Sequence, residues 1–268
     1  MVISINQNTK ICISISKNPG STGSKFHNTA YKLLKLNYIY FPIKIDNLDN
    51  IKNLIKKFNL KGCSVSMPFK EQIIKYLDLK DISAIKTNAV NTLILKNKKL
   101  KGYNTDYYAA KIILKKIKLK KIDKVLLLGN GGVSKTIFEC LKKVKISKIY
   151  LCSRNKNKYK NWVKTNNSEI LNWNERNKKN CYLLINGTSI GMKTKKCPIN
   201  LKSLNNFSCI LDLVINSKSN LKKFAINKKI RFYDGLEFSF IQASKQFQIY
   251  TNKKVNLKIL KKKLNYNF

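Results

Sequence analysis

Five short apolar runs, separated by intervals long enough for a helix, constrain the second half of this 268-residue chain more than any other feature. They are Lys124–Leu128, Lys148–Cys152, Tyr182–Asn186, Cys209–Val214 and Ile230–Tyr233. Continuous apolar runs without polar alternation are typical of parallel strands covered on both faces. The pattern predicts a doubly wound α/β domain of the Rossmann type.

The first half predicts a second α/β domain with a largely parallel sheet, because strand-like runs again alternate with helix-like segments. The predicted strands are Ile11–Ser16, Tyr38–Ile45, Gly62–Ser66 and Thr92–Leu95, and the helices are His27–Leu36 and Ile51–Phe58. Asp106–Ile117 is predicted to be a helix that joins the halves. The chain after Gly235 is predicted to be helical and to return to the first half. We therefore expect one domain over residues 1–104 plus 238–268, and another over residues 105–237.

A glycine-rich turn follows the first strand of the Rossmann-type domain and precedes a helix through Ile137 and Leu141. Glycines in such a turn let the backbone approach a pyrophosphate, and the helix N-terminus faces that anion with free N–H groups. Ser134 stands at the third glycine of the usual fingerprint. We expect the turn to bind a dinucleotide; the alternative is an ordinary strand-to-helix turn. The residues expected to contact the dinucleotide are Gly129, Asn130, Gly131, Gly132 and Val133.

The residues after the second strand favour NADP over NAD. An NAD enzyme places an acidic side chain there for the ribose hydroxyls, whereas this chain reads Cys152-Ser-Arg-Asn155. Arg154 stands where a 2′-phosphate would lie, and we expect Ser153 and Asn155 to contact the cofactor beside it. The alternative is that Arg154 is a surface arginine present by chance.

The net charge of +42 does not by itself indicate nucleic acid. Only three of the 55 basic residues are arginines, and the lysines are spread over the whole chain. A protein built to grip phosphates or bases favours the planar guanidinium. We therefore attribute the charge to composition and expect no specific nucleic-acid partner. A non-catalytic basic protein that binds nucleotides or nucleic acid stays as the alternative, recognisable by salt-sensitive binding.

The cysteine and hydropathy patterns limit which other classes of protein the chain can belong to. The seven cysteines are scattered without a C-x-x-C pair, and there is one histidine, so we expect reduced thiols and no metal site. No apolar run is long enough to cross a bilayer and no signal peptide is evident, so we expect a cytoplasmic protein without a membrane partner.

Several ordered motifs together make the chain resemble the shikimate dehydrogenase family, with the closest likeness to its shikimate dehydrogenase-like branch. They cover nearly the whole chain: Ser64-Val-Ser-Met-Pro-Phe-Lys-Glu71, Ala89-Val-Asn-Thr92, Tyr103-Asn-Thr-Asp106, Gly129-Asn-Gly-Gly132, Asn186-Gly-Thr-Ser-Ile-Gly-Met192, Asp234-Gly235 and Gln242-Ala243. The resemblance implies NADPH-dependent reduction of 3-dehydroshikimate to shikimate, in the biosynthesis of chorismate and aromatic amino acids. It also implies cofactor contacts at Thr188, Leu213 and Gly235.

The resemblance assigns catalytic roles to two charged residues. Lys70 matches the family's proton-transfer lysine, and Asp106 matches the aspartate that pairs with this lysine and binds a substrate hydroxyl. Asp106 could instead be the N-cap of the following helix. The resemblance also implies substrate contacts from Asn91, Gln242, Ser66, Ser21 and Ser24. His27, the only histidine, falls on the family's His-Asn pair and is expected to be structural.

Three departures from the family pattern bear on the substrate. Gly23 stands where the second serine of the carboxylate-binding loop is expected, Ile215 replaces a substrate-contacting tyrosine, and Glu237-Phe238 replaces a Gly-Met pair. A divergent dehydrogenase for quinate or a related substrate is therefore an alternative. We expect the substrate to lie in a cleft between the two domains, and the protein to be a monomer or a homodimer.

Overall fold

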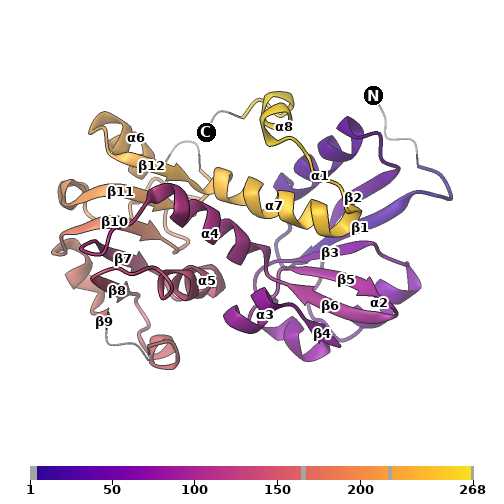
Figure 1. Cartoon of the computed structure of the whole chain (residues 1–268), viewed down its shortest axis with the longest axis horizontal. Helices are drawn as coiled ribbons and strands as arrows, with labels where there is room; N and C mark the ends of the chain where they lie inside the picture. Colours follow the sequence, from indigo (N-terminus) through magenta and orange to yellow (C-terminus); the bar gives the residue numbers. More distant parts are fainter. Residues whose placement is uncertain (1–4, 164–166, 217–218, 267–268) are drawn as a thin grey trace. The chain divides into compact units, whose positions relative to one another are not determined.

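The computed structural model describes residues 5–163, 167–216 and 219–266. The chain divides into two compact units, which are residues 1–108 with 240–268 (unit 1) and residues 109–239 (unit 2). Both boundaries fall inside helices, namely α4 (Thr105–Ile117) and α7 (Gly235–Thr251), which Figure 1 labels. Within the described part of the chain, no helix is both long and apolar enough to cross a membrane.

Unit 1 contains a six-stranded sheet in the order β2-β1-β3-β5-β6-β4. Its strands are β1 (Lys10–Ser16), β2 (Tyr38–Lys44), β3 (Gly62–Val65), β4 (Leu79–Lys80), β5 (Thr92–Lys96) and β6 (Lys99–Tyr103). The predicted parallel part is formed by β2, β1 and β3. The sheet then continues with two antiparallel pairings, β3 with β5 and β5 with β6.

The sequence reading missed the hairpin of β5 and β6. Its two turn residues, Asn97 and Lys98, both have positive φ, at 49° and 59°. A two-residue hairpin turn of this kind is usually marked by Asn-Gly, and a lysine at the second position hides the signal. The hairpin returns the chain to the edge of the sheet where β3 ends, which places Asn91 and Asn104 near one another.

Helices α1 (Thr22–Leu33), α2 (Ile51–Lys57) and α3 (Ile82–Thr87) belong to unit 1, with a 3₁₀ turn at Gln72–Tyr76. One core cluster packs α2 against the sheet through residues such as Ile13, Ile55 and Val65. Helix α1 starts a turn earlier than predicted and stops before Lys35, whose φ of 50° ends it. The C-terminal helix α7 returns to unit 1 as predicted: Phe240 and Phe247 form ring contacts with residues of α1.

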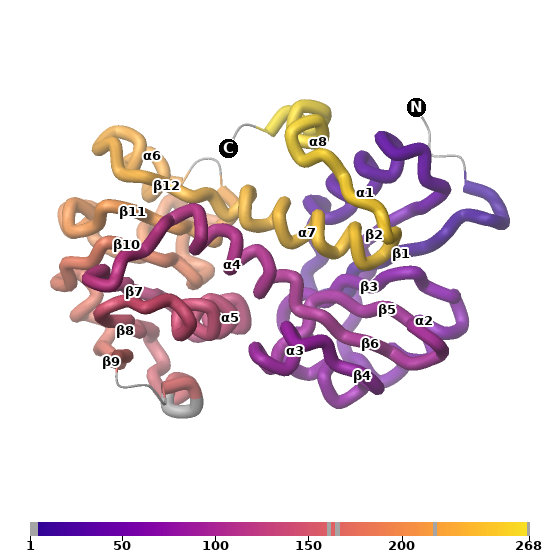
Figure 2. The backbone as a smooth tube through the Cα atoms, viewed as in Figure 1, coloured from indigo at the N-terminus to yellow at the C-terminus, as the bar shows by residue number. Residues whose placement is uncertain are grey.

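Unit 2 contains a sheet of six parallel strands in the order β12-β11-β10-β7-β8-β9, which Figure 1 shows from top to bottom. The strands are β7 (Lys124–Leu128), β8 (Lys148–Cys152), β9 (Ser168–Leu171), β10 (Cys181–Asn186), β11 (Phe207–Asp212) and β12 (Arg231–Asp234). This is the Rossmann-type order, with its reversal between β7 and β10. Figure 2 shows the same backbone as a tube, coloured along the chain.

The five predicted strands of unit 2 are all present, and β9 was missed because only four residues with mixed polarity form it. Helices α5 (Gly132–Leu141) and α6 (Asn220–Asn227) lie in this unit. The short helix α8 (Leu257–Lys263) follows α7 in unit 1, and 3₁₀ turns occupy Asn157–Asn161, Trp173–Asn177 and Leu201–Asn206. A core cluster of buried residues, including Leu126, Leu184 and Ile210, joins the central strands.

Candidate active site

Lys70 and Asp106 form an ion pair in unit 1. Lys70 Nζ lies 2.6 Å from Asp106 Oδ2, and the two side chains are 20% and 7% exposed. Lys70 is held by its neighbours, because Phe69 is buried in the core and the Lys70 carbonyl accepts a hydrogen bond from Val90 N–H. The pair therefore presents a fixed cation and carboxylate that are mostly, but not entirely, removed from solvent.

Sheet topology explains why these residues meet. The carboxyl end of β3 pairs with the amino end of β5, where Ser64 lies opposite Thr92. The amino end of β5 pairs in turn with the carboxyl end of β6, where Thr92 lies opposite Tyr103. Lys70 follows β3 and Asp106 follows β6, so the antiparallel hairpin brings both to the same edge.

Asn104, not Asp106, caps helix α4. The Asn104 side-chain oxygen accepts the Asp106 backbone N–H at 3.1 Å, and the Asn104 carbonyl accepts that of Tyr107. Asp106 lies within the first turn of the helix, where the helix dipole favours a carboxylate. The N-cap alternative for Asp106 is therefore wrong, and its carboxylate is directed to Lys70 instead.

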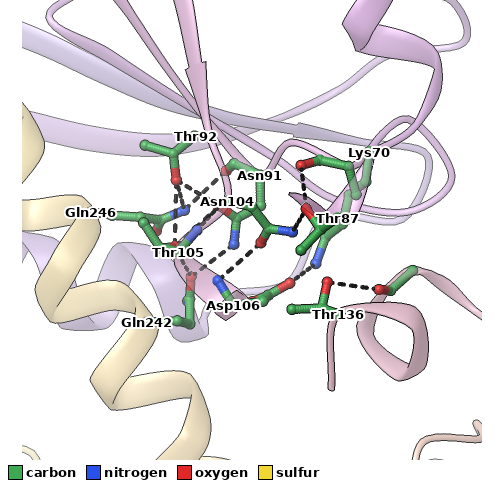
Figure 3. A network of polar contacts seen from close by, with 12 residues as sticks. Lys70, Thr87, Asn91, Thr92, Asn104, Thr105, Asp106, Thr136, Gln242 and Gln246 are labelled. Carbon is green, nitrogen blue, oxygen red and sulfur yellow. Dashed lines mark hydrogen bonds and ion pairs between the residues drawn. The ribbon is translucent and has the colours of Figure 1, made fainter. Parts of the chain in front are cut away.

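Asn91 and Gln242 lie beside this pair in a connected network (Figure 3). Asn91 Oδ1 accepts the Thr105 backbone N–H at 2.8 Å, and Asn91 Nδ2 donates to Gln242 Oε1 at 3.4 Å. Thr105 Oγ1 also donates to Gln242 Oε1, at 3.0 Å. The structure thus brings together four of the predicted site residues, which are Lys70, Asp106, Asn91 and Gln242.

Sequence reasoning missed two polar residues of the network. Thr105 is the middle residue of the Asn-Thr-Asp motif, and its hydroxyl lies 3.1 Å from Asn91 Oδ1 and 3.0 Å from Gln242 Oε1. Gln246 lies one helical turn after Gln242 and donates to the Asn91 carbonyl and to Thr92 Oγ1, both at 3.0 Å. The four-residue spacing on α7 was the signal available for it.

The three predicted serines follow β1 and β3, which are neighbouring parallel strands: Ser66 lies just after β3, Ser21 is the N-cap of α1, and Ser24 lies in the first turn of α1. Ser66 and Ser21 are exposed, and Ser24 is half-buried with its hydroxyl donating to the Ser21 carbonyl. A Cβ atom on Gly23 would lie 3.3 Å from Tyr40 Oη. A serine at position 23 would therefore need the Tyr40 side chain to move by a few tenths of an ångström.

His27 lies in the aromatic core of unit 1, next to the Gln246 side chain of this network. Its ring stacks on that of Tyr40 at 4.3 Å between centroids, and both ring nitrogens are buried without a hydrogen-bond partner among the described residues. Burial lowers the pKa of His27 to about 3, so the imidazole is neutral. Its neighbour Asn28 bonds the Tyr40 backbone N–H and C=O, which joins α1 to β2. Both contacts are structural.

The predicted cofactor residues of unit 2 all follow the carboxyl ends of parallel strands. The glycine turn follows β7, Ser153 to Asn155 follow β8, Thr188 follows β10, Leu213 follows β11 and Gly235 follows β12. Ligands of open α/β sheets bind outside this edge, at the point where the strand order reverses. Arg154 is exposed there, and Ser153 Oγ donates to the Asn155 carbonyl at 2.7 Å.

The glycine turn has the geometry that a pyrophosphate requires. Gly129 has a φ of 97°, which favours glycine, and a Cβ atom there would lie 2.7 Å from the Gly187 carbonyl oxygen. Cβ atoms on Gly131 or Gly132 would enter open space. Gly131 precedes α5 and has no side chain to cap it, so the helix N-terminus can present its N–H groups to an anion. These residues fit a dinucleotide.

Ser134 replaces the third glycine because the close contact is accommodated by Gly187. Ser134 is fully buried, and its Oγ donates to the Gly187 carbonyl at 3.2 Å. A Cβ atom on Gly187 would lie 2.2 Å from Ser134 Oγ. The helix α5 therefore approaches β10 closely even though the usual glycine is absent from the helix.

The residues that depart from the family pattern after β11 and β12 differ in burial and in charge pairing. Ile215 is exposed after β11. Phe238 is buried, and Glu237 forms an ion pair with Lys116 at 2.5 Å, so its charge is compensated. Next to Leu213, Asp212 accepts hydrogen bonds from Asn186 Nδ2 and Val214 N–H, and burial raises its pKa to about 6.

Comparisons with known proteins match almost the whole chain to one family. Residues 16–93 match the family model of the shikimate dehydrogenase substrate binding domain. The chain is 35% identical over 236 residues to shikimate dehydrogenase (NADP(+)) of Clostridium beijerinckii, covering 86% of this chain and 87% of that protein. It is 31% identical over 260 residues to the shikimate dehydrogenase-like protein of Haemophilus influenzae, covering 93% of each.

Solved structures give the same result. The crystal structure of shikimate dehydrogenase from Aquifex aeolicus has a TM-score of 0.88 at 28% identity, covering 98% of this chain and 100% of that one. The fold, the ordered motifs and a relative above 30% identity over most of both chains lead to one conclusion. The chain belongs to the shikimate dehydrogenase family.

Proposed function

We propose that this protein is an NADP-dependent shikimate dehydrogenase, which reduces 3-dehydroshikimate to shikimate in the biosynthesis of chorismate and aromatic amino acids. The observation that carries the proposal is the Lys70–Asp106 ion pair, with the Asn91 and Gln242 amides beside it. We place the substrate on unit 1 and the cofactor at the carboxyl edge of the unit 2 sheet. Such a substrate carries hydroxyl groups, which the Asp106 carboxylate and the Asn91 and Gln242 amides can bind.

Reduction of a ketone needs a hydride on carbon and a proton on oxygen. NADPH, when bound, supplies the hydride. The Lys70 ammonium donates a proton to the carbonyl oxygen as the alcohol O–H forms, and it afterwards regains a proton from water. Asp106 holds the ammonium at 2.6 Å and accepts a hydrogen bond from a substrate hydroxyl with its carboxylate.

Features of unit 2 support NADP as the cofactor. Arg154 is exposed after β8, no acidic residue follows that strand directly, and the relative from Clostridium beijerinckii is named for NADP(+). A guanidinium binds a 2′-phosphate through charge-assisted hydrogen bonds that an unphosphorylated ribose cannot make.

The test is a spectrophotometric assay of purified protein with shikimate, quinate and 3-dehydroshikimate, each with the NADP and NAD forms of the cofactor. We expect the fastest turnover with the shikimate pair and NADP(H). Preferred turnover of quinate would assign the chain to the divergent alternative. Absence of any turnover, together with salt-sensitive binding of nucleic acid, would favour the non-catalytic alternative.

A further inference from the structure

We infer that Gln246 is a positioning residue: through the Thr92 hydroxyl, and together with the Thr105 backbone N–H, it holds the Asn91 amide so that the Asn91 and Gln242 amides both offer N–H groups to the substrate. The inference rests on the proposed function for the identity of the substrate. The hydrogen-bond chain itself is a property of unit 1 alone. Gln246 is 4% exposed and lies on α7, one turn beyond Gln242.

Two backbone groups anchor the chain at its ends. The Asn91 carbonyl can only accept, and a Gln246 side-chain atom lies 3.0 Å from it, so that atom must be the Nε2 amide. The Thr105 backbone N–H can only donate, and an Asn91 side-chain atom lies 2.8 Å from it, so that atom must be Oδ1. Neither amide can therefore be flipped without placing two donors or two acceptors face to face.

The Thr92 hydroxyl connects the two anchored ends. Gln246 Nε2 donates its second hydrogen to Thr92 Oγ1 at 3.0 Å. Because this lone pair of the hydroxyl is occupied, the Thr92 hydrogen is directed to Asn91 Oδ1 at 2.7 Å. Thr92 is fully buried, so water does not compete for either bond.

The consequence for the site is a fixed polarity. Asn91 Oδ1 is saturated by Thr92 and Thr105, which leaves Asn91 Nδ2 as the group that reaches towards Gln242. The Thr105 hydroxyl lies 3.1 Å from Asn91 Oδ1 and 3.0 Å from Gln242 Oε1, and it has one hydrogen to donate. Because Asn91 Oδ1 already accepts two hydrogens, this one goes to Gln242 Oε1, which directs the Gln242 Nε2 group away from Thr105. Figure 3 shows Gln246, Thr92 and Asn91 above Gln242, joined by dashed lines that mark these hydrogen bonds. The two amide donors and the Asp106 carboxylate can then bind the hydroxyl groups of the proposed substrate, because a hydroxyl both accepts and donates hydrogen bonds.

Gln246→Glu tests the direction of the chain, since a carboxylate accepts but cannot donate. The Thr92 hydroxyl would then turn its hydrogen to the introduced carboxylate, and Asn91 would lose one of the bonds that hold its amide. We expect the KM for shikimate to rise about tenfold or more, with kcat changed less and the KM for NADP unchanged. Gln248→Glu is the matched control, because Gln248 lies on the same helix, is half-buried and accepts a hydrogen bond from Lys245. It should behave as wild type.

Shikimate analogues that each lack one ring hydroxyl separate positioning from a general loss of structure. For the analogue without the hydroxyl that Asn91 binds, wild type and Gln246→Glu should have the same kcat/KM, whereas the other analogues should keep the difference. An equal loss for every analogue, or a parallel rise in the KM for NADP, would overturn the inference. So would wild-type kinetics of Gln246→Glu.

Thr92→Val is the second variant if Gln246→Glu does not fold. Valine has the shape of threonine but no hydroxyl, so the same rise in the shikimate KM is expected with Gln246 intact.

NMR of the side-chain amides in the ligand-free protein measures the orientation of the Asn91 amide without any substrate. Asn91 side-chain amide protons should show contacts to Gln242 in wild type and lose them in Gln246→Glu. Unchanged contacts would refute the inference, while inactivity of wild type towards shikimate would refute only the proposed function.

Discussion

Lys70 Nζ lies 2.6 Å from Asp106 Oδ2, although 36 residues separate them in the chain. The two reach this distance because β5 and β6 form a hairpin that returns the chain to the carboxyl end of β3. A cation held in this way can transfer a proton at a defined position, which is the requirement of general acid catalysis.

Lys70→Met should abolish turnover without preventing cofactor binding. The variant keeps the length of the side chain but removes the proton donor, so we expect kcat to fall by about 100-fold or more. NADPH binding, followed by the fluorescence of the nicotinamide, should be unchanged. Lys80→Met is the control, because Lys80 is an exposed lysine of β4. An unchanged rate in Lys70→Met would rule out the proposed role.

Arg154→Gln should reduce the preference for NADPH over NADH. The exposed guanidinium after β8 is expected to bind the 2′-phosphate, so its loss should raise the KM for NADPH about tenfold or more and leave that for NADH nearly unchanged. Arg231→Gln provides a matched control, since Arg231 is exposed at the amino end of β12, away from the edge where the cofactor is proposed to bind. Equal effects of the two substitutions would contradict the assignment.

His27→Phe should make the protein less sensitive to acid. The pKa of His27 is about 3 in the folded protein and about 6.5 when unfolded. Between these values the unfolded state binds the extra proton, so the free energy of unfolding falls as the pH falls. At pH 5 this loss amounts to about 2 kcal/mol for wild type.

Urea unfolding of wild type and His27→Phe at pH 7 and pH 5 measures the effect. The quantity compared is the change between the two pH values within each protein, so any difference in packing of the larger ring cancels. His27 is the only histidine, which makes the comparison specific. Equal changes in both proteins would show that His27 is accessible to protons in the folded state.

Gly187→Ala should destabilise unit 2. The added Cβ atom would lie 2.2 Å from Ser134 Oγ and 2.9 Å from the Leu128 carbonyl oxygen, and such overpacking costs about 1–3 kcal/mol. Adding Ser134→Gly removes the first of these clashes and should recover part of the loss in thermal stability. If the double variant is no more stable than Gly187→Ala, the Ser134 contact is not what limits residue 187 to glycine.

Gly131→Ala should weaken cofactor binding without destabilising unit 2. Its Cβ atom would enter open space, so the melting temperature should stay close to that of wild type. The same atom would occupy the space proposed for the pyrophosphate, and NADPH binding should weaken. A stable variant with unchanged NADPH affinity would place the pyrophosphate elsewhere.

The local sequence determined much of unit 2, because buried parallel strands are continuous apolar runs and the glycine turn is read directly. All five predicted strands are present there: β7 and β8 have the predicted ends, and the ends of the other three differ by at most two residues. The candidate site residues were predicted from the ordered motifs. The weak signals failed where the pattern was short or polar, as in β9, or where a lysine occupied the second turn position, as in the hairpin at Asn97 and Lys98.

Only the tertiary structure decided how the motif residues act on one another. Sequence reasoning left Asp106 open as a helix cap, whereas the structure gives this role to Asn104 and directs the Asp106 carboxylate to Lys70. It also shows that Gly187 makes room for Ser134. The physical reason is that strand pattern and turn chemistry are local properties of the chain, whereas hydrogen-bond direction and close packing depend on residues that the fold brings together from distant segments.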